Sequence, residues 1–280
     1  MKAANKNIFR EIKATKGRFL SIFLICAIGV GFFSGVRATE NDMRISADDY
    51  YDRHDLFDIR VLSSFGLTDG DAEAIRGIEG VSGVYPSKYT DLAMFREETQ
   101  MLTRVYSLTG DGINNIDITD GRMPQAEDEC IVSYNILRDG AKVGDVVRLE
   151  DITDAEEFPL KYTEYKVVGL YETPMFISLT QRGSTTIGDG SIDAFMCISE
   201  SNFTQEVYTE IYVSSEKMKE KKSYSNEYEQ LRDSISESLE ELAPERNDIR
   251  YEEVTADAVK KIEDGEKELA DAKIAGQKEL

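Results

Sequence analysis

Histidine and cysteine, the usual zinc ligands, are scarce in this sequence. The 280 residues include one histidine, His54, and three cysteines. Zinc sites take several Cys or His ligands at short spacings, and no such group occurs, so we expect no metal site. A histidine alone in a sequence belongs more often to a surface or an interface than to a metal site, and we expect this of His54.

Two catalytic motifs are also absent. No Gly-x-x-x-x-Gly-Lys-Ser/Thr loop occurs, which excludes ATP binding of the P-loop kind. No Gly-x-Ser-x-Gly occurs either, and any Ser or Cys triad would have to use His54. We therefore expect no enzyme activity and no cofactor. An unrecognised carboxylate site stays open, because Asp and Glu are abundant.

Basic residues are concentrated at the N-terminus and are outnumbered elsewhere. Residues 1–18 hold six Lys or Arg and one acidic residue, and the rest of the chain has 27 basic and 53 acidic side chains, a net charge of −26. Such a surface repels phosphate, so nucleic acid is excluded as a partner.

One long stretch has no charged residue. It runs from Phe19 to Val36 (FLSIFLICAIGVGFFSGV), and no second run of this kind follows in residues 37–280. Eighteen helical residues cover about 27 Å, close to the roughly 30 Å hydrocarbon core of a bilayer. The sequence predicts a transmembrane helix at 19–36, with membrane lipids around it. The alternative is a secretory signal cleaved near Ala38, but the run is longer than the about 7–15 apolar residues of a signal.

The charges that flank this run predict its orientation. Residues 1–18 are basic, whereas the residues just after Val36 are mostly acidic. Basic flanks stay in the cytoplasm, so we expect residues 1–18 to be cytoplasmic and residues 37–252 to form an extracytoplasmic domain. Ile8, Phe9 and Ile12 recur at helical spacing among basic residues, which fits an amphipathic segment on the inner leaflet or the cytoplasmic end of the same helix.

Three small residues share one face of the predicted membrane helix. Ala27, Gly31 and Gly35 are four residues apart. Small residues in this register let two helices approach closely within lipid, although glycine is also common in membrane helices generally. We expect this face to pack against other transmembrane helices, either of the same protein or of a second copy.

The middle of the chain predicts an α+β domain with a mixed sheet. Thr68 and Asp71 have the spacing of a helix N-cap. Short strand-like stretches separated by Gly, Asp and Pro turns predict eight strands, at 56–62, 81–85, 101–108, 130–133, 143–149, 165–171, 194–198 and 207–213. Cys130 and Cys197 lie in such strands, which favours buried free thiols over a disulfide.

The C-terminal part predicts long helices. An apolar face from Tyr224 to Leu242 indicates an amphipathic helix that stops near Pro244, and a short extended piece follows at 248–251. Beyond it, Gly265-Glu-Lys-Glu-Leu269 recurs as Gly276-Gln-Lys-Glu-Leu280. A period of eleven suits a nearly straight coiled coil, so we expect one to start at 253–280 and to be cut short at 280. A frayed terminal helix is the alternative.

Several segments in order resemble one family. They are NIFREIKATKGRFLSIFLICAIGVGFFSGVRAT, DLFDIRVLSSFGLTDGDAEAIRGIEGVSGVYP, DGRMPQAEDECIVS, KVGDVVRL and YKVVGLYETP. Over roughly residues 5–215 the chain resembles the FtsX/MacB-type permease subunits of ABC transporters, particularly the long Gram-positive ones. The resemblance implies that this chain holds the first transmembrane helix, the outer domain and the start of a coiled coil.

The resemblance also implies a function and partners. In such permeases a separate cytoplasmic ABC ATPase subunit drives the membrane helices, and the outer domain transmits their motion. The implied function is transmembrane transport or mechanotransmission. A membrane-anchored extracytoplasmic sensor or scaffold without transport activity is the alternative, and it would need no ATPase.

Overall fold

The computed structural model describes residues 6–7, 10, 15–96, 99–110, 112–133, 142–153, 157–176 and 183–278. The chain forms two compact units, Met1–Tyr50 and Tyr51–Leu280. The segment expected to be amphipathic around Ile8, Phe9 and Ile12 lies outside the described residues.

The first unit consists of the helix α2 (Lys16–Arg53), whose last three residues belong to the second unit. None of its 38 residues is buried. Two hydroxyl groups donate to carbonyls one turn back, Ser21 to Gly17 at 2.9 Å and Thr39 to Gly35 at 2.9 Å. Both hydroxyls are thereby satisfied within the helix, which for Ser21, inside the apolar run, is what an apolar solvent requires.

Most strands of the second unit form one mixed sheet that closes on itself. Its strands are β3 (Tyr89–Arg96), β4 (Thr99–Ser107), β5 (Asp117–Gly121), β6 (Glu129–Ser133), β7 (Val146–Glu150), β8 (Glu164–Glu172) and β9 (Ala194–Ile198). Their order is β5-β8-β6-β9-β4-β3-β7, and β7 also pairs with β8. Pairs β4–β9 and β6–β8 are parallel. The β7–β8 pairing closes six strands into a barrel, which removes the open edges of the sheet.

Alternate residues of the six barrel strands form the main core. Leu92, Met94, Val132, Val147 and Met196 belong to this cluster, and each is at most 1% exposed. A second cluster on the opposite face of these strands contains Phe195, which stacks on Phe176 of the short 3₁₀ turn Pro174–Phe176 at a centroid distance of 3.6 Å. Another 3₁₀ turn spans Glu200–Asn202.

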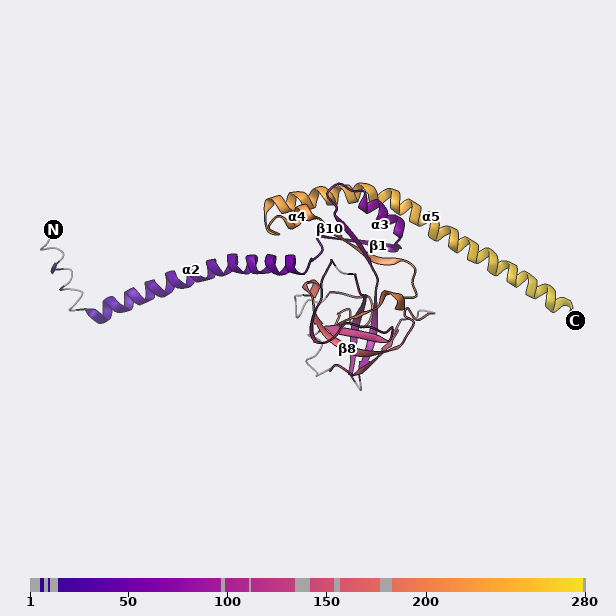
Figure 1. The fold of residues 1–280 in the computed structure, drawn as a ribbon, viewed down its shortest axis with the longest axis horizontal. Coiled ribbons are helices and arrows are strands. Elements are labelled where there is room, and N and C mark those ends of the chain that lie inside the picture. The colour runs from indigo at the N-terminus through magenta and orange to yellow at the C-terminus, as the bar shows by residue number, and fades with distance from the viewer. Residues whose placement is uncertain are drawn as a thin grey trace. The chain divides into compact units, whose positions relative to one another are not determined.

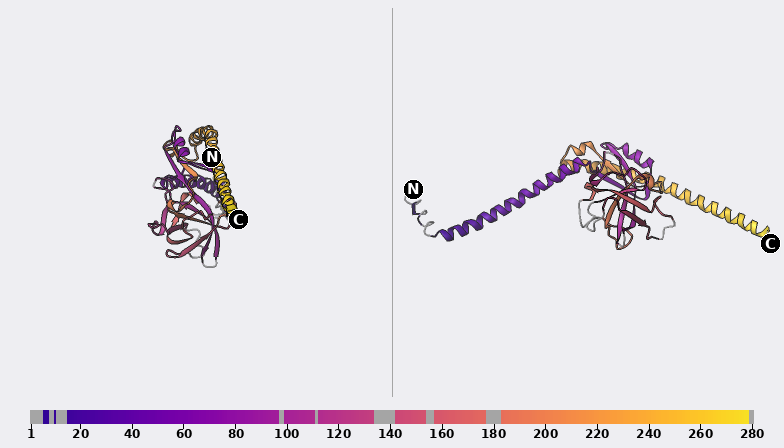
Figure 2. Two further views of the ribbon diagram at one scale, coloured as in Figure 1. Left: turned by 90° about the vertical axis from the view of Figure 1, so that its right-hand side faces the viewer. Right: turned by 60° about the horizontal axis from the view of Figure 1, so that its bottom comes forward.

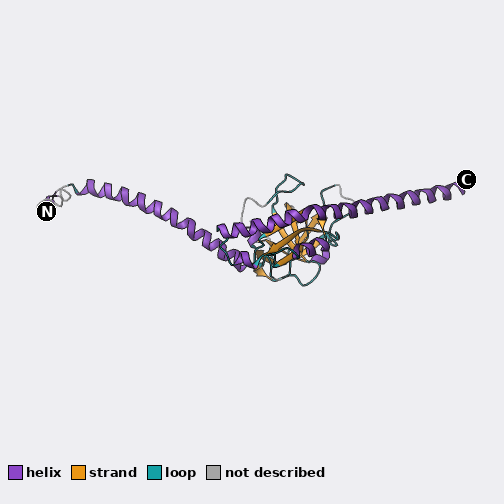
Figure 3. Ribbon diagram, turned by 90° about the horizontal axis from the view of Figure 1, so that it is seen from above, coloured by secondary structure: helices purple, strands orange, loops and turns teal. Residues whose placement is uncertain are grey.

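A smaller antiparallel sheet completes the second unit. It has the order β1-β10-β2, with β1 at Ile59–Leu67, β10 at Tyr208–Ser214 and β2 at Gly83–Ser87. Its core is shared with α3 (Asp69–Arg76) and with Leu239 and Leu242 of α5 (Asn226–Lys278). The short α4 spans Glu216–Lys219. Helices α3 and α5 lie at the end of this unit opposite the barrel strand β8 (Figure 1), and α5 runs across the strands (Figure 3).

The α+β class and the mixed sheet are confirmed, and so is the helix start at Thr68. Its hydroxyl accepts from the Asp71 N–H, and the Asp71 carboxylate accepts from the Thr68 N–H, which makes a capping box. Each of the eight predicted strands overlaps an observed one. Strands β3 and β5 were not expected.

The predicted break near Pro244 is wrong, and so is the extended piece at 248–251. Helix α5 continues through both as far as Lys278. A proline removes one helical hydrogen bond, and contacts on both sides of it hold the helix. Leu239 and Leu242 pack before it, and Arg246 Nε donates to Asp71 at 2.6 Å after it. Towards its C-terminus the helix extends away from the rest of the second unit (Figure 2).

Cys130 and Cys197 are buried free thiols, as expected. The Cys197 thiol donates to the Tyr171 hydroxyl at 3.2 Å. Burial raises the pKa of Cys197 to about 12, so this thiol is protonated and unreactive near neutral pH.

Candidate functional site: the junction segment and its cavity

The small residues of α2 present an uncovered face. Ala27, Gly31 and Gly35 are exposed, and a Cβ built at either glycine meets no atom within 4 Å in the described part of the chain. Within the described residues, α2 is the one helix that is long and apolar enough to cross a membrane. Packing of this face against another helix stays a prediction.

Residues 51–58 connect α2 to β1, and we call them the junction segment. Its first anchor is the loop before β5. The Asn114 N–H donates to the Asp55 carbonyl at 2.8 Å, and the Asn115 side chain donates to the Asp55 carboxylate at 2.7 Å. Asp55 and Asn114 both have φ near +50°, a strained region for residues with a side chain. These bonds hold the segment in that conformation.

His54 lies in the same anchor. It is 7% exposed, and its Nε2 is 2.7 Å from the Asp117 carboxylate. The lone histidine is therefore a buried residue that ties the segment to β5, and not an exposed one. The described residues contain no group of three or more His, Cys, Asp or Glu that could hold a metal ion.

Asp58 forms the second anchor, to β10 and α5. Its carboxylate accepts from the Ser215 N–H at 2.8 Å and from the Tyr228 hydroxyl at 2.9 Å. Its own N–H donates to Val213 at 3.0 Å, and the neighbouring Phe57 ring stacks on Tyr212. Burial raises the pKa of Asp58, and the Ser215 and Tyr228 donors oppose that shift only in part. The start of α5 is thus bonded to the segment that leaves α2.

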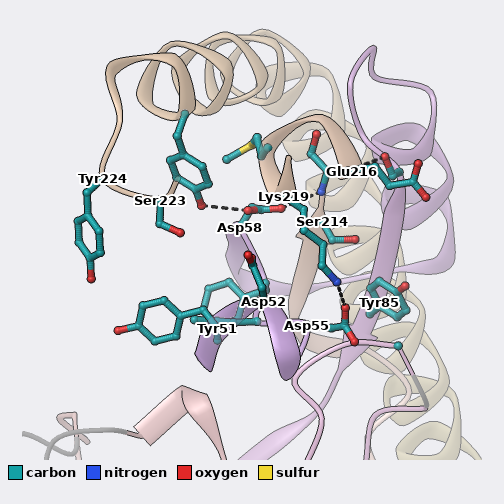
Figure 4. A pocket seen from close by; sticks show the side chains of 17 residues that line it. Tyr51, Asp52, Asp55, Asp58, Tyr85, Ser214, Glu216, Lys219, Ser223 and Tyr224 are labelled. Carbon is teal, nitrogen blue, oxygen red and sulfur yellow. Dashed lines mark hydrogen bonds and ion pairs between the residues drawn. The ribbon is translucent and has the colours of Figure 1, made fainter. Parts of the chain in front are cut away.

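A cavity of about 420 Å³ opens beside these anchors. The junction segment lines one side of it, and the end of β10, α4 and the start of α5 line the other. Figure 4 shows Asp52, Asp55 and Lys219 in its wall, with Lys219 paired to Asp55. We call this space the junction cavity.

Sequence reasoning found none of this site. Its residues come from four separate stretches of the chain, and only the acidic Tyr/Asp composition around His54 marked one of them. Asn114, Ser215 and Tyr228 carry no motif, since each acts through a partner that the fold brings to it.

One buried acid of β10 leads to a pH prediction. Glu210 is fully buried, and Arg60 lies 3.7 Å from its second oxygen. Burial raises the pKa of Glu210, and the Tyr212 hydroxyl and Arg60 offset this only partly. The folded state therefore keeps a proton that the unfolded chain has released, and stability falls as pH rises above about 4.5.

We expect Glu210→Gln to reduce the fall in stability with rising pH. A smaller fall should remain, because burial also raises the pKa of Asp58. Thermal unfolding of the full chain between pH 4.5 and 7.5 measures it, with the exposed Glu206→Gln as matched control. An unchanged slope in Glu210→Gln would show that the carboxyl is ionised in the folded protein.

Comparisons with known proteins come from sequence families and from solved structures. The family model of the MacB-like periplasmic core domain matches residues 19–231. No curated protein matches the chain.

The solved structures similar to this chain include three at low identity. The extracellular domain of the noncanonic ABC-type transporter YknZ from Gram-positive bacteria is 14% identical, with 65% of this chain and 87% of that chain covered and a TM-score of 0.38. The periplasmic region of MacB from Actinobacillus actinomycetemcomitans is 12% identical, covering 65% and 75%, with a TM-score of 0.36. A domain of a putative permease protein from Porphyromonas gingivalis is 17% identical, covering 54% and 69%, with a TM-score of 0.32.

Proposed function

The chain belongs to the family of MacB-like periplasmic core domains, and we propose that it is the first membrane helix and outer domain of an ABC transporter permease driven by a separate ATPase. The observation that carries the proposal is the extent of the match. It begins within the apolar run of α2, continues through both sheets and ends at Leu231 in α5, so helix and domain belong to one family unit.

The proposed function of the permease is transmembrane transport or mechanotransmission, and the proposed role of the outer domain is to transmit motion. The junction segment supports this role, because the chain that leaves α2 is hydrogen-bonded within a few residues to α5. A displacement of residues 51–53 would reach α5 through Asp58 and Tyr228. Helix α5 then extends as a lever, and the apolar Tyr251, Ile262 and Leu269 along it are exposed, as the proposed coiled coil requires. We propose no catalytic activity for the chain itself.

The proposed orientation places residues 1–18 in the cytoplasm and the second unit outside. Thiol labelling tests it well, because Cys130 and Cys197 are buried and Cys26 lies in the apolar run. In intact cells, a membrane-impermeant maleimide should label Glu79→Cys, which is exposed on the second unit, but not Lys6→Cys. After lysis both should react. Labelling of Lys6→Cys alone in intact cells would reverse the orientation.

Co-purification tests the ATPase partner. The tagged chain, expressed in its native host and extracted in mild detergent, is expected to bring down an ATPase with a Gly-x-x-x-x-Gly-Lys-Ser/Thr loop. An unrelated single-span protein with the same tag is the control. If no such ATPase is enriched over that control, the chain acts as an anchored sensor or scaffold.

A further inference from the structure

We propose that the junction cavity binds an alkylammonium group, carried by a small amine or by a lysine side chain. The cavity has a volume of about 420 Å³, within the roughly 300–1,000 Å³ of small-molecule sites. This site is separate from the proposed role in transport and does not depend on it.

The charge of the cavity favours a cation. Four carboxylates line it, from Asp52, Asp55, Asp58 and Glu216, against the single ammonium group of Lys219. Lys219 is already paired with Asp55, and it is half exposed. The carboxylates of Asp58 and Glu216 repel phosphate and carboxylate ligands and attract a second ammonium group.

The aromatic lining favours an organic cation over a metal ion. Tyr51, Phe57, Tyr85, Tyr224 and Tyr228 all line the cavity. Aromatic faces attract ammonium groups and cover an alkyl stem, whereas a divalent metal needs several oxygen or nitrogen ligands together. Among the described residues no such group of ligands exists.

A buried polar group in the wall is left without a partner. Ser215 lines the cavity and is 3% exposed, and its hydroxyl has no hydrogen-bond partner within the described part of the chain. Buried hydroxyls are nearly always bonded, so this one indicates a missing donor or acceptor. The Asp58 carboxylate accepts from two neutral donors, the adjacent Ser215 N–H and the Tyr228 hydroxyl, and the ammonium group of Lys219 acts on it only through its charge. An ammonium group beside Ser215 would donate a hydrogen bond to its hydroxyl and place a positive charge next to the Asp58 carboxylate.

The test is calorimetric titration of the full chain in mild detergent with two probes. Cadaverine represents a free amine, and Nα-acetyl-lysine amide represents a peptide side chain. Glutarate, which carries two carboxylates on a similar stem, is the anionic control. We expect one or both amines to bind and glutarate not to bind. The tighter of the two amines identifies the source of the group.

Two variants should move the affinity in opposite directions. Asp58→Asn keeps the acceptor oxygen but removes the charge, and we expect about tenfold weaker amine binding. Lys219→Gln removes the competing cation and should tighten binding severalfold. Glu79→Gln, an exposed acid outside the cavity, should have no effect.

If Asp58→Asn fails to fold, Lys219→Gln still tests the proposal, because it is expected to tighten amine binding. Lys219 is half exposed, so Lys219→Gln should fold, and a circular-dichroism melt checks both variants. No binding of either amine overturns the proposal. So does equal weakening in Glu79→Gln and Asp58→Asn, which would mean that amines bind the acidic surface without a site.

Discussion

Asp71→Ala is expected to lower the free energy of unfolding of the second unit by about 3 kcal/mol. Asp71 is 5% exposed, and its carboxylate accepts from the Thr68 N–H at 2.7 Å and from Arg246 Nε at 2.6 Å. The substitution removes the N-cap partner of α3 and leaves the guanidinium of Arg246, mostly buried against α3, without its carboxylate. Urea unfolding of the full chain in detergent, followed by circular dichroism, measures the loss.

The stabilisation that the Asp71 carboxylate provides should also depend on pH. Burial raises the pKa of its carboxyl, but the hydrogen bonds from Arg246 and Thr68 together outweigh burial, and the net pKa is lowered. The stabilisation is therefore fully present at pH values above about 4, the pKa of Asp71 in the unfolded chain. It is lost as the pH falls through the lower pKa of Asp71 in the folded protein. Asp71→Ala should show no such contribution.

Glu73→Ala is the matched control, since it changes an acid of the same helix. Its ion pair with Arg76 is at the surface, with Glu73 77% exposed, and we expect a loss of under about 0.5 kcal/mol. A double-mutant cycle with Arg246→Ala should give a coupling of at least about 1 kcal/mol. Equal losses for the two acids would mean that α3 and α5 are not held together at Asp71.

Local chemistry explains which elements could be predicted. The start of α3 depends on Thr68 and Asp71, three residues apart, so the sequence alone indicates it. Strand β9 is a continuous apolar run of five residues between polar neighbours, so it could be predicted at the bounds Ala194–Ile198. In β3, Leu92, Ala93 and Met94 are all buried because both faces of the strand are covered, but the polar residues Thr90 and Asp91 near the start of the strand mask the pattern. Strand β5 carries two aspartates and is mostly exposed.

Pairing between distant segments explains what could not be predicted. Barrel closure depends on β7 meeting both β3 and β8, and on β4 meeting β9 some ninety residues later in parallel. The apolar pattern of a segment predicts that it forms a strand, but it does not predict which other strand it pairs with. The continuation of α5 through Pro244 has the same origin, since Asp71, the partner of Arg246, lies 175 residues away. The bonds from His54 to Asp117, from Asn115 to Asp55 and from Tyr228 to Asp58 likewise join residues far apart in the sequence.

A pair of acidic substitutions in α2, Leu24→Asp with Ile28→Asp, is expected to release the chain from the membrane. Eleven of the eighteen residues from Phe19 to Val36 are Leu, Ile, Phe or Val. At about 0.3–0.6 kcal/mol each they favour insertion by roughly 5 kcal/mol in total. Two aspartates near the centre cost about 5–7 kcal/mol, which cancels that gain. Extraction of membranes with alkaline carbonate, followed by immunoblotting, measures the release.

The surroundings of these two residues make the outcome decisive. Leu24 and Ile28 are 46% and 69% exposed and pack in none of the three hydrophobic cores of the described chain. In a helix bathed by water, replacing them with aspartate would remove exposed apolar surface and leave the second unit intact. Only lipid around the helix makes the same change severe. Leu24→Ala with Ile28→Ala, which keeps the run uncharged, should stay in the membrane pellet. If the aspartate pair stays there as well, α2 is not what anchors the chain.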